Sequence, residues 1–433
     1  MRWSGGLAWM VVLSLSLYLT VLFTPKESRF AIENKLLRAV RPPPSIKSKP
    51  MQLLEPPCLA DWRRARPSPP SPLVEDVKRL CRDNTSTLAI GSRRWYSAFH
   101  QPHFAEHFLF YWSVLLETTA RRGPCQHLLM SVLEEVTEFW NDIYWGRRTW
   151  VTQLIHILHR SLGEFIISDS EAARWRITSL NSEADDLREK QGLWLFHPSD
   201  GAVLTSVLLN TDICHHLQAS STSANVTVLQ RKSSRGILNL DEVRRTIPSA
   251  PSLPKSTKTS TAFFDSMSLT EQAQALLFTD LLVAVHGAGE TNIVFMRPCS
   301  VVVEILPHGY RGPGGDHLMS LGGYFGSLAR SLDIIFLQYM ESKSNSILER
   351  SARTGGGLFS GNRRSCTQFY DQLPHDKDLA SQTCMKSKYC RACARQANMV
   401  INTTSLLELV EKGFKLRSTC RMIHPAYSKY NKT

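Results

Sequence analysis

The segment Leu281–Pro307 constrains the fold more than any other part of this sequence. Two mainly apolar runs, Leu281–Val285 and Val301–Ile305, stand on either side of the short turn His286–Gly289. Such runs are typical of parallel strands that are buried on both faces. Parallel neighbours need a crossover connection, which is nearly always right-handed. We therefore predict a βαβ unit whose helix opens near Thr291.

The turn of this unit has the features of a nucleotide site. Gly287 and Gly289 let the backbone approach a phosphate at the positive end of the helix, although the third glycine of the dinucleotide fingerprint is missing. Glu304 follows Gly287 by 17 residues and ends a strand, where a carboxylate can bind both ribose hydroxyls. The alternatives are an ordinary tight turn and a Glu304 that pairs with a nearby arginine such as Arg311.

The neighbouring sequence extends this unit into an α/β sheet. Val226–Gln230 is a β-branched run that predicts a strand, and Asp241–Ile247 predicts a helix. Ser268–Phe278 predicts another helix, opened by a capping box with Glu271. Ser249–Thr261 is rich in Ser, Pro and Lys, and we expect it to be an inserted loop. The basic run Arg231–Arg235 follows the first strand, where arginines suit a pyrophosphate, although an exposed basic turn is the alternative.

The N-terminal half has a different organisation. Leu7–Phe23 is an uncharged apolar run of seventeen residues, which we interpret as a signal anchor rather than a cleaved signal. The Pro-rich stretch that follows predicts an extended stem. From Phe104 to Trp175 the apolar residues, among them Leu128, recur at helical spacing, so we expect a helix-rich region.

Cysteines and sequons favour an oxidising compartment. The ten cysteines are an even number and suggest disulfides, not zinc ligands. The four Asn-x-Ser/Thr sequons are Asn84, Asn225, Asn402 and Asn431. We expect a single-pass type II protein of the Golgi or endoplasmic reticulum membrane with a lumenal globule. The net charge of +13 favours acidic partners, but no nucleic-acid-binding motif is present, so no nucleic acid is expected.

Several motifs together resemble one enzyme family. They are Arg231…Arg235-Gly-Ile-Leu-Asn239, His286-Gly-Ala-Gly…Thr291-Asn292, Val303-Glu304-Ile305, Gly323-Tyr324-Phe325 and, more weakly, His103-Phe104-Ala105…His107 and Arg391–Val410. This ordered set resembles glycosyltransferase family 61, which includes lumenal O-GlcNAc transferases and plant β-xylosyltransferases. The resemblance implies a GT-B fold, with two Rossmann-like domains facing a cleft, a nucleotide-sugar donor that is usually a UDP sugar, and inversion at the anomeric carbon. Glu290 stands where the family usually has leucine, and turned inward it would repel the donor pyrophosphate.

The resemblance also implies roles for individual residues. The donor-binding candidates are Arg231, Arg235, Asn239, His286, Gly287, Gly289, Thr291, Asn292 and Glu304. Inverting transfer needs a base, which should come from the N-terminal half across the cleft. His103, Glu106 and His107 are the catalytic candidates. The arginines and the glycine turn can stabilise the departing nucleotide, so no metal or other cofactor is expected.

Two further patterns are set aside. Asp376-Lys377-Asp378 is a literal D-x-D, but it does not follow a hydrophobic strand, and we expect a solvated loop. The His286–Gly289 turn is also similar to a lipase oxyanion loop, but the chain has no Gly-x-Ser-x-Gly elbow.

The sequence therefore predicts five parts. They are a signal anchor (1–24), a stem (25–73), an acceptor-side domain (74–215), a nucleotide-sugar-binding domain (216–350) and a Cys-rich C-terminal segment that completes the fold (351–433). The predicted function is that of an inverting glycosyltransferase acting on a glycoprotein or polysaccharide acceptor. The alternative is a catalytically inactive, glycan-binding relative.

Overall fold

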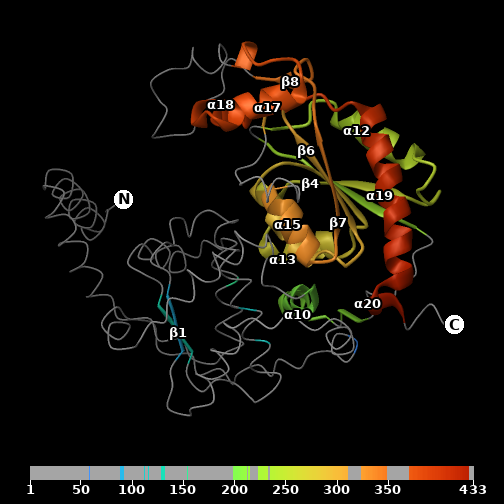
Figure 1. Cartoon of the computed structure of the whole chain (residues 1–433). Helices are drawn as coiled ribbons and strands as arrows, with labels where there is room; N and C mark the ends of the chain where they lie inside the picture. The colour runs from blue at the N-terminus through green and yellow to red at the C-terminus, as the bar shows by residue number, and fades with distance from the viewer. Residues whose placement is uncertain are drawn as a thin grey trace, which may run out of the picture. The chain divides into compact units, whose positions relative to one another are not determined.

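The computed structural model describes residues 198–211, 213–214, 223–232, 235–310, 323–348 and 370–428, together with residues 58, 88–91, 112, 116, 128–131 and 154. A five-stranded sheet in the order β4-β3-β5-β6-β7 forms the centre of this part, and all its strands are parallel (Figure 1). The strands are β3 (Asn225–Leu229), β4 (Lys258–Ala262), β5 (Leu281–Val285), β6 (Val301–Leu306) and β7 (Ile335–Met340). This is a Rossmann-like α/β arrangement, and it confirms the parallel sheet predicted from the apolar runs.

Two predicted helices are confirmed. α12 spans Leu240–Thr246 and α13 spans Leu269–Leu277. The capping box of α13 is present, because the Ser268 hydroxyl accepts from the Glu271 N–H and the Glu271 carboxylate accepts from the Ser268 N–H. Both orphan donors at this helix start are thereby satisfied.

The loop predicted over Ser249–Thr261 is wrong at its C-terminal end, where β4 begins at Lys258. β4 is the sheet edge, and its exposed residues Lys258 and Ser260 alternate with partly buried threonines. An edge strand is partly exposed and often carries a lysine, so it lacks the apolar run of a buried strand. The polar sequence of β4 therefore gives no strand signal.

The helix predicted near Thr291 begins earlier and is of a different type. It is the 3₁₀ helix η4 (Ala288–Phe295), and the Glu290 N–H donates to the Gly287 carbonyl at 2.9 Å. This three-residue spacing gives a tighter turn than an α-helix. η4 begins three residues after the end of β5, and its residues 290–295 are buried.

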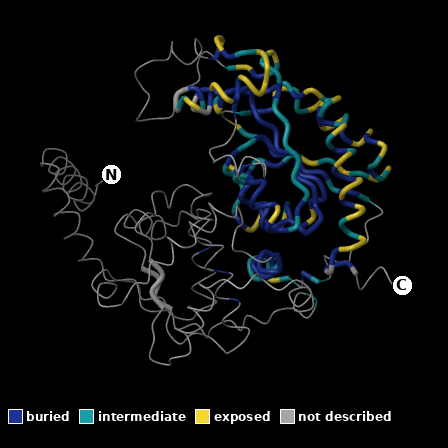
Figure 2. Tube along the Cα trace, in the orientation of Figure 1, coloured by how far each residue is buried: buried dark blue, intermediate teal, exposed yellow. Residues whose placement is uncertain are grey.

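Helices cover both faces of the sheet. α12 and α19 (Thr403–Ile423) lie on one face, and α13 and α15 (Gly323–Ser331) lie on the other (Figure 1). Strands β3, β5 and β6 are buried almost throughout, whereas α19 alternates between buried and exposed residues (Figure 2). The core beneath α19 is apolar and consists mainly of Val226, Val228, Val283, Val303, Ile305, Val243, Leu406, Val410 and Phe414.

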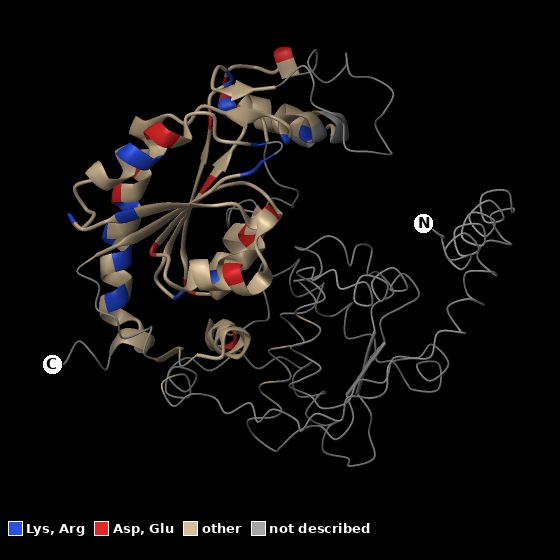
Figure 3. Cartoon of the chain, turned by 180° about the vertical axis from the view of Figure 1, so that it is seen from behind, with Lys and Arg blue, Asp and Glu red and all other residues tan. Residues whose placement is uncertain are grey.

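α19 approaches the sheet closely at Gly413. A Cβ at this position would lie 2.6 Å from Val301 Cγ1, so a side chain would push the helix off β6. Glu408, Lys412 and Lys415 of this helix are exposed, and Figure 3 shows the charged residues along it. A disulfide between Cys299 and Cys420 joins the end of α19 to the segment before β6.

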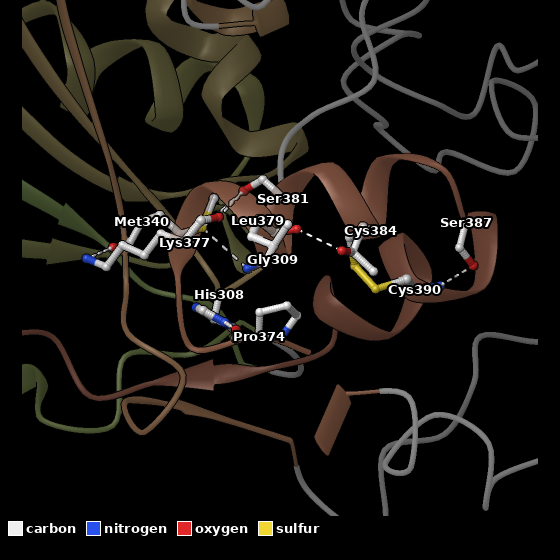
Figure 4. Close-up of a disulfide and its surroundings, with 11 residues drawn as sticks. His308, Gly309, Met340, Pro374, Lys377, Leu379, Ser381, Cys384, Ser387 and Cys390 are labelled. Carbon is white, nitrogen blue, oxygen red and sulfur yellow. Dashed lines mark hydrogen bonds between the residues drawn. A yellow bond between two sulfur atoms is a disulfide. The ribbon is translucent and has the colours of Figure 1, made fainter. Parts of the chain in front are cut away.

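The C-terminal segment also forms a layer at the end of the sheet where the strands finish. α17 (Lys377–Met385) and α18 (Lys388–Ala394) are joined by the disulfide Cys384–Cys390 (Figure 4). Their buried residues pack with Leu306 and Tyr310, which follow β6. β8 (Ser346–Ile347) pairs with β9 (Asn398–Met399), and α20 (Pro425–Ser428) follows α19.

Only isolated parts of the N-terminal half are described. Trp112, Leu116 and Leu154 are helical and buried, and Trp112 Nε1 donates to the Asp200 carbonyl of α10 (Pro198–Leu209) at 3.1 Å.

The helix-rich prediction is wrong at Leu128. β2 (Leu128–Ser131) is a strand, paired in parallel with β1 (Leu88–Gly91). Sheet pairing with a distant segment overrides the local helical spacing here.

The predicted anchor and most of the predicted stem lie outside the described residues. Within the described part of the chain, no helix has the length and apolarity needed to cross a membrane. The disulfide prediction is confirmed for this part, where Cys58 also pairs with Cys214 and none of the cysteines is free.

Candidate donor-binding site

The candidate site lies at the carboxyl ends of the central strands. Arg231 follows β3, His286 follows β5, Glu304 lies near the end of β6 and Gln338 lies opposite it on β7. Because the strands are parallel, these ends meet at one edge of the sheet. Open α/β sheets bind ligands at this edge.

Two arginines converge above Gly287. A Cβ on this glycine would lie 2.5 Å from Arg231 Nη1 and 3.3 Å from Arg235 Nη1, so glycine leaves the space that both guanidinium groups occupy. Arg235 Nη1 donates to the His286 carbonyl at 2.7 Å. Arg235 has φ +62°, which is uncommon for a residue with a Cβ and is kept only where surrounding contacts hold it.

The electrostatics of this pair favour an anion. Burial, and after it the charge of Arg231, lowers the pKa of Arg235 from its ordinary value to about 10. The Nε atoms of both residues are buried and have no hydrogen-bond partner. Two adjacent cations with unsatisfied donors would gain both charge compensation and hydrogen bonds from a phosphate.

His286 is held in place by a contact at each ring nitrogen. Its Nδ1 lies 2.5 Å from Glu304 Oε1, and its Nε2 lies 3.1 Å from the Tyr310 hydroxyl. A carboxylate can only accept, so Nδ1 carries a proton and donates it to Glu304 Oε1. Tyr310 and Phe325 pack against the imidazole at ring-centroid distances of 4.9 and 5.3 Å.

Glu304 is buried and is used within the protein. Its side chain is 1% exposed, Oε1 accepts from His286 and Oε2 accepts from Gln338 Nε2. The alternative partner Arg311 lies outside the described residues. The carboxylate therefore orients His286, and ribose binding by Glu304 stays a prediction that must compete with these two contacts.

Glu290 points into the same buried region. It is fully buried, and neither carboxyl oxygen has a donor partner. One of its carboxyl oxygens lies within 4.8 Å of a carboxyl oxygen of Glu304. Two carboxylates are both acceptors, so they can share a hydrogen bond only if one of them carries a proton. Burial, and after it the charge of Glu304, raises the pKa of Glu290 well above 4.5, against the opposing effect of Arg235 and Arg231.

The same three side chains have the composition of a metal site but fit a cation poorly. One ligand atom each from His286, Glu290 and Glu304 lies within 4.8 Å of the others. However, His286 Nδ1 and Glu304 Oε1 are already hydrogen-bonded to each other. The positive charges of Arg231 and Arg235 also act on Glu290. A cation would have to displace that bond next to two positive charges.

The remaining predicted donor residues have contacts within the fold. Asn239 donates to the Ile401 carbonyl and accepts from the Ile401 N–H, joining the start of α12 to the segment before α19. Thr291 and Asn292 are fully buried, and Asn292 Nδ2 donates to the Gly289 carbonyl. A Cβ on Gly289 would lie 3.1 Å from Leu229 Cδ2, so this glycine serves close packing. Their donor-binding roles stay predictions.

The structure adds four residues that sequence reasoning missed. Tyr310, Phe325 and Gln338 surround the His286–Glu304 pair, and Arg395 lies with its guanidinium carbon 6.0 Å from the Tyr310 ring centroid. The charge of Arg395 also acts on Arg235. Phe325 and Arg395 fall within segments quoted for the family resemblance, which is the only signal that could have found them.

Other predicted positions have different outcomes. His103, Glu106 and His107 lie outside the described residues, as do Asn84 and Asn431. Asp376, in the literal D-x-D, is the N-cap of α17, where its carboxylate accepts from the Leu379 N–H at 2.8 Å.

Comparison with protein families identifies a match to part of the chain. The family model described as Glycosyltransferase 61 matches residues 97–303, which include the arginine pair, the glycine turn and the first half of β6. A search of the curated proteins returns no significant match. The matched range contains the quoted motifs that lie between His103 and Val303. This match supports the assignment of residues 97–303 to glycosyltransferase family 61, and with it a glycosyltransferase activity.

Proposed function

We propose that the chain is an inverting glycosyltransferase that binds a UDP sugar at the carboxyl edge of the sheet and transfers the sugar to a glycoprotein or glycan. The observation that carries this proposal is the arginine pair above Gly287. Arg231 and Arg235 are adjacent, partly buried cations, and each retains an Nε without a hydrogen-bond partner. A diphosphate carries the charge and the acceptor oxygens that this pair lacks.

The same arginines suit the chemistry of the leaving group. In an inverting transfer the acceptor hydroxyl oxygen bonds to the anomeric carbon while the bond from that carbon to the diphosphate oxygen breaks. The departing UDP keeps the electron pair, and the acceptor proton passes to a base. Arg231, Arg235 and Arg395 can stabilise the charge that develops on the diphosphate, so we expect transfer without a metal.

The acceptor side is assigned to the N-terminal half. A GT-B arrangement would place this half across a cleft from the sheet, and we propose that His103, Glu106 or His107 supplies the base. We also propose a type II membrane protein with a lumenal catalytic domain. The disulfides support an oxidising compartment, because such bonds are rare in the cytosol.

UDP binding to the purified chain tests the donor site. Arg235→Ala should weaken UDP binding by about 1.5–3 kcal/mol, because it removes a charge-assisted contact. Arg395→Ala should weaken UDP binding less, because Arg395 is exposed to solvent. Lys232→Ala is the matched control, since Lys232 is exposed and lies over the Phe263 ring, 5.8 Å from its centroid. Equal UDP affinity in all four proteins, measured by calorimetry, would contradict the proposed site.

Activity needs a separate measurement. Release of UDP from a panel of nucleotide sugars should identify one preferred donor, and Arg235→Ala should reduce that release. A chain that binds UDP tightly but releases none from any donor, with or without glycan acceptors, would support the inactive glycan-binding alternative instead.

A further inference from the structure

Glu290 is a buried acid that lies next to a second buried acid, Glu304, and has no hydrogen-bond donor in the described part of the chain. Its carboxyl group is completely buried, has an oxygen within 4.8 Å of one on the buried carboxyl group of Glu304 and receives no donor from any described residue. Burying an unpaired carboxylate next to another one is strongly unfavourable. Some positive species must therefore compensate the pair.

A proton is the species that fits the contacts. Glu304 already accepts hydrogen bonds from His286 Nδ1 and Gln338 Nε2, so it is the carboxylate of the pair. Glu290 has no donor partner, so it is the member that can itself donate. One proton on Glu290 then satisfies an orphan oxygen and removes the repulsion in a single step.

The charge of Glu290, which depends on this proton, acts on the arginines of the donor site. Arg235 and Arg231 are the two cations that act on Glu290, and they are also the proposed ligands of the diphosphate. An ionised Glu290 would compete with the diphosphate for their charge. A neutral Glu290 leaves them free.

We propose that Glu290 carries a proton in the donor-binding form of the enzyme, that this proton bonds its carboxyl group to Glu304, and that loss of the proton lowers the affinity of the arginine pair for the donor diphosphate. This inference rests on the proposed donor site. It makes Glu290 a positioning residue whose protonation controls donor binding.

The surroundings of Glu290 are consistent with this assignment. The titratable groups that face it are Glu304 from β6, His286 from the turn after β5, Tyr310 from the segment after β6, and Arg231 and Arg235 from the segment after β3. Arg395 acts on Arg235 and Tyr310 from the end of α18.

The helices packed against η4 do not alter this balance. Asp200 of α10, Glu271 of α13 and Arg330 of α15 are their only Asp, Glu, Lys or Arg residues. None of the three is among the groups that shift the pKa of Glu290.

The test compares UDP affinity across pH in three proteins: the wild type, Glu290→Gln and the control Glu408→Gln. Glutamine keeps the shape and a donor but cannot ionise, and Glu408 is an exposed acid on α19. Calorimetry from about pH 5 to about pH 9 covers the range documented for buried glutamates. A terminal phosphate itself titrates at about pH 6, so the ratio of wild-type to variant affinity is the quantity to follow.

We expect Glu290→Gln and the wild type to bind UDP within about twofold at the acid end. The wild type should then weaken by about tenfold relative to Glu290→Gln as pH rises, which corresponds to one unfavourable charge near the site. The ratio of Glu408→Gln to wild type should stay constant. A constant ratio of wild type to Glu290→Gln across this range would overturn the effect on donor binding.

A second measurement separates this inference from the proposed function. The infrared difference spectrum between wild type and Glu290→Gln at neutral pH, without ligand, should contain the carbonyl band of a protonated carboxyl group. Its absence would overturn the protonation whether or not UDP binds. If the band is present but UDP binds neither protein at any pH, the donor site is overturned while the protonated acid stands.

Discussion

Asp280 of the sheet and Arg417 of α19 are 137 residues apart in the sequence and form a buried ion pair. Asp280 directly precedes β5. Its Oδ1 also pairs with Arg297 Nη2 at 2.7 Å and with Arg421 Nη2 at 3.4 Å. Its second oxygen accepts from the Asn225 N–H at 2.9 Å. One carboxylate therefore joins β3, the segment before β6 and the C-terminal helix.

Replacement of Asp280 should destabilise the fold strongly. Asp280→Asn keeps the shape but leaves buried guanidinium groups without their counter-charge, and breaking a buried ion pair in this way costs about 3–5 kcal/mol of unfolding free energy. Chemical denaturation monitored by circular dichroism measures this loss. Asp241→Asn is the control, because its pair with Arg244 spans 3.8 Å at the surface. If both variants unfold at the same denaturant concentration, the cluster around Asp280 does not hold α19 to the sheet.

Glu304→Gln should lower both stability and donor affinity. In the wild type both carboxylate oxygens accept, one from His286 and one from Gln338. The amide of glutamine turns one of these oxygens into a donor that faces another donor, which leaves a buried polar group unsatisfied at a cost of about 1–3 kcal/mol. The melting temperature without ligand should fall, and UDP should bind more weakly because the His286 carbonyl holds Arg235.

The nucleotide analogue 2′-deoxy-UDP tests the ribose prediction for Glu304 separately. If Glu304 binds the ribose, removal of the 2′-hydroxyl weakens binding to the wild type more than to Glu304→Gln. If Glu304 acts only through His286, removal of the 2′-hydroxyl weakens nucleotide binding by the same factor in both proteins. A variant with unchanged melting temperature and unchanged UDP affinity would contradict the contacts described for both oxygens.

The ligand-free stability of the chain should fall with rising pH because of Glu290. Its folded-state pKa is raised above the unfolded value of 4.5, so the folded chain binds more protons than the unfolded chain between these two values. The stabilising effect of the proton is complete below 4.5 and is lost as pH rises through the folded pKa. Thermal unfolding across this range should show a steeper decline for the wild type than for Glu290→Gln. Parallel curves would mean that the buried carboxyl group is ionised throughout.

The strands of the sheet were predictable because burial on both faces requires a long apolar run. The runs at Leu281–Val285 and Val301–Ile305 carry that signal, and the capping box at Ser268 carries an equally local one. β4 has neither, because an edge strand is half exposed and tolerates Lys258 and Ser260.

The position of the site was predictable, but the partners of its residues were not. Arg231 and Arg235 follow β3, Gly287 follows β5, and Glu304 lies near the end of β6. These strands are neighbours in the sheet, so parallel pairing alone brings the four residues to one edge. The pairing of Glu304 with Gln338 depends on strand register, which no local pattern specifies. The inward turn of Glu290 depends on η4 being a 3₁₀ helix that starts at Ala288.

The sequons at Asn402 and Asn225 should differ in glycan occupancy if the globule is lumenal as proposed. Asn402 is exposed as the N-cap of α19, where its Oδ1 accepts from the Ser405 N–H at 3.1 Å. A glycan attaches through Nδ2, so the cap and the glycan are compatible. Asn225 begins β3, its Nδ2 donates to the Phe278 carbonyl, and the hydroxyl of its sequon residue Thr227 is buried against Thr279.

Thr404→Val separates the glycan at Asn402 from the cap, because it removes the sequon and leaves the Asn402 side chain in place. The secreted globular part of this variant should lose the mass of one glycan and keep the melting temperature of the enzymatically deglycosylated wild type. Asn402→Asp also removes the sequon while keeping an oxygen that can cap the helix, so it should behave in the same way. Asn402→Ala removes both, and its melting temperature should fall further, since loss of an N-cap typically costs about 1 kcal/mol. Peptide mass mapping that finds Asn225 occupied and Asn402 bare would contradict the accessibility of these two sites in the fold.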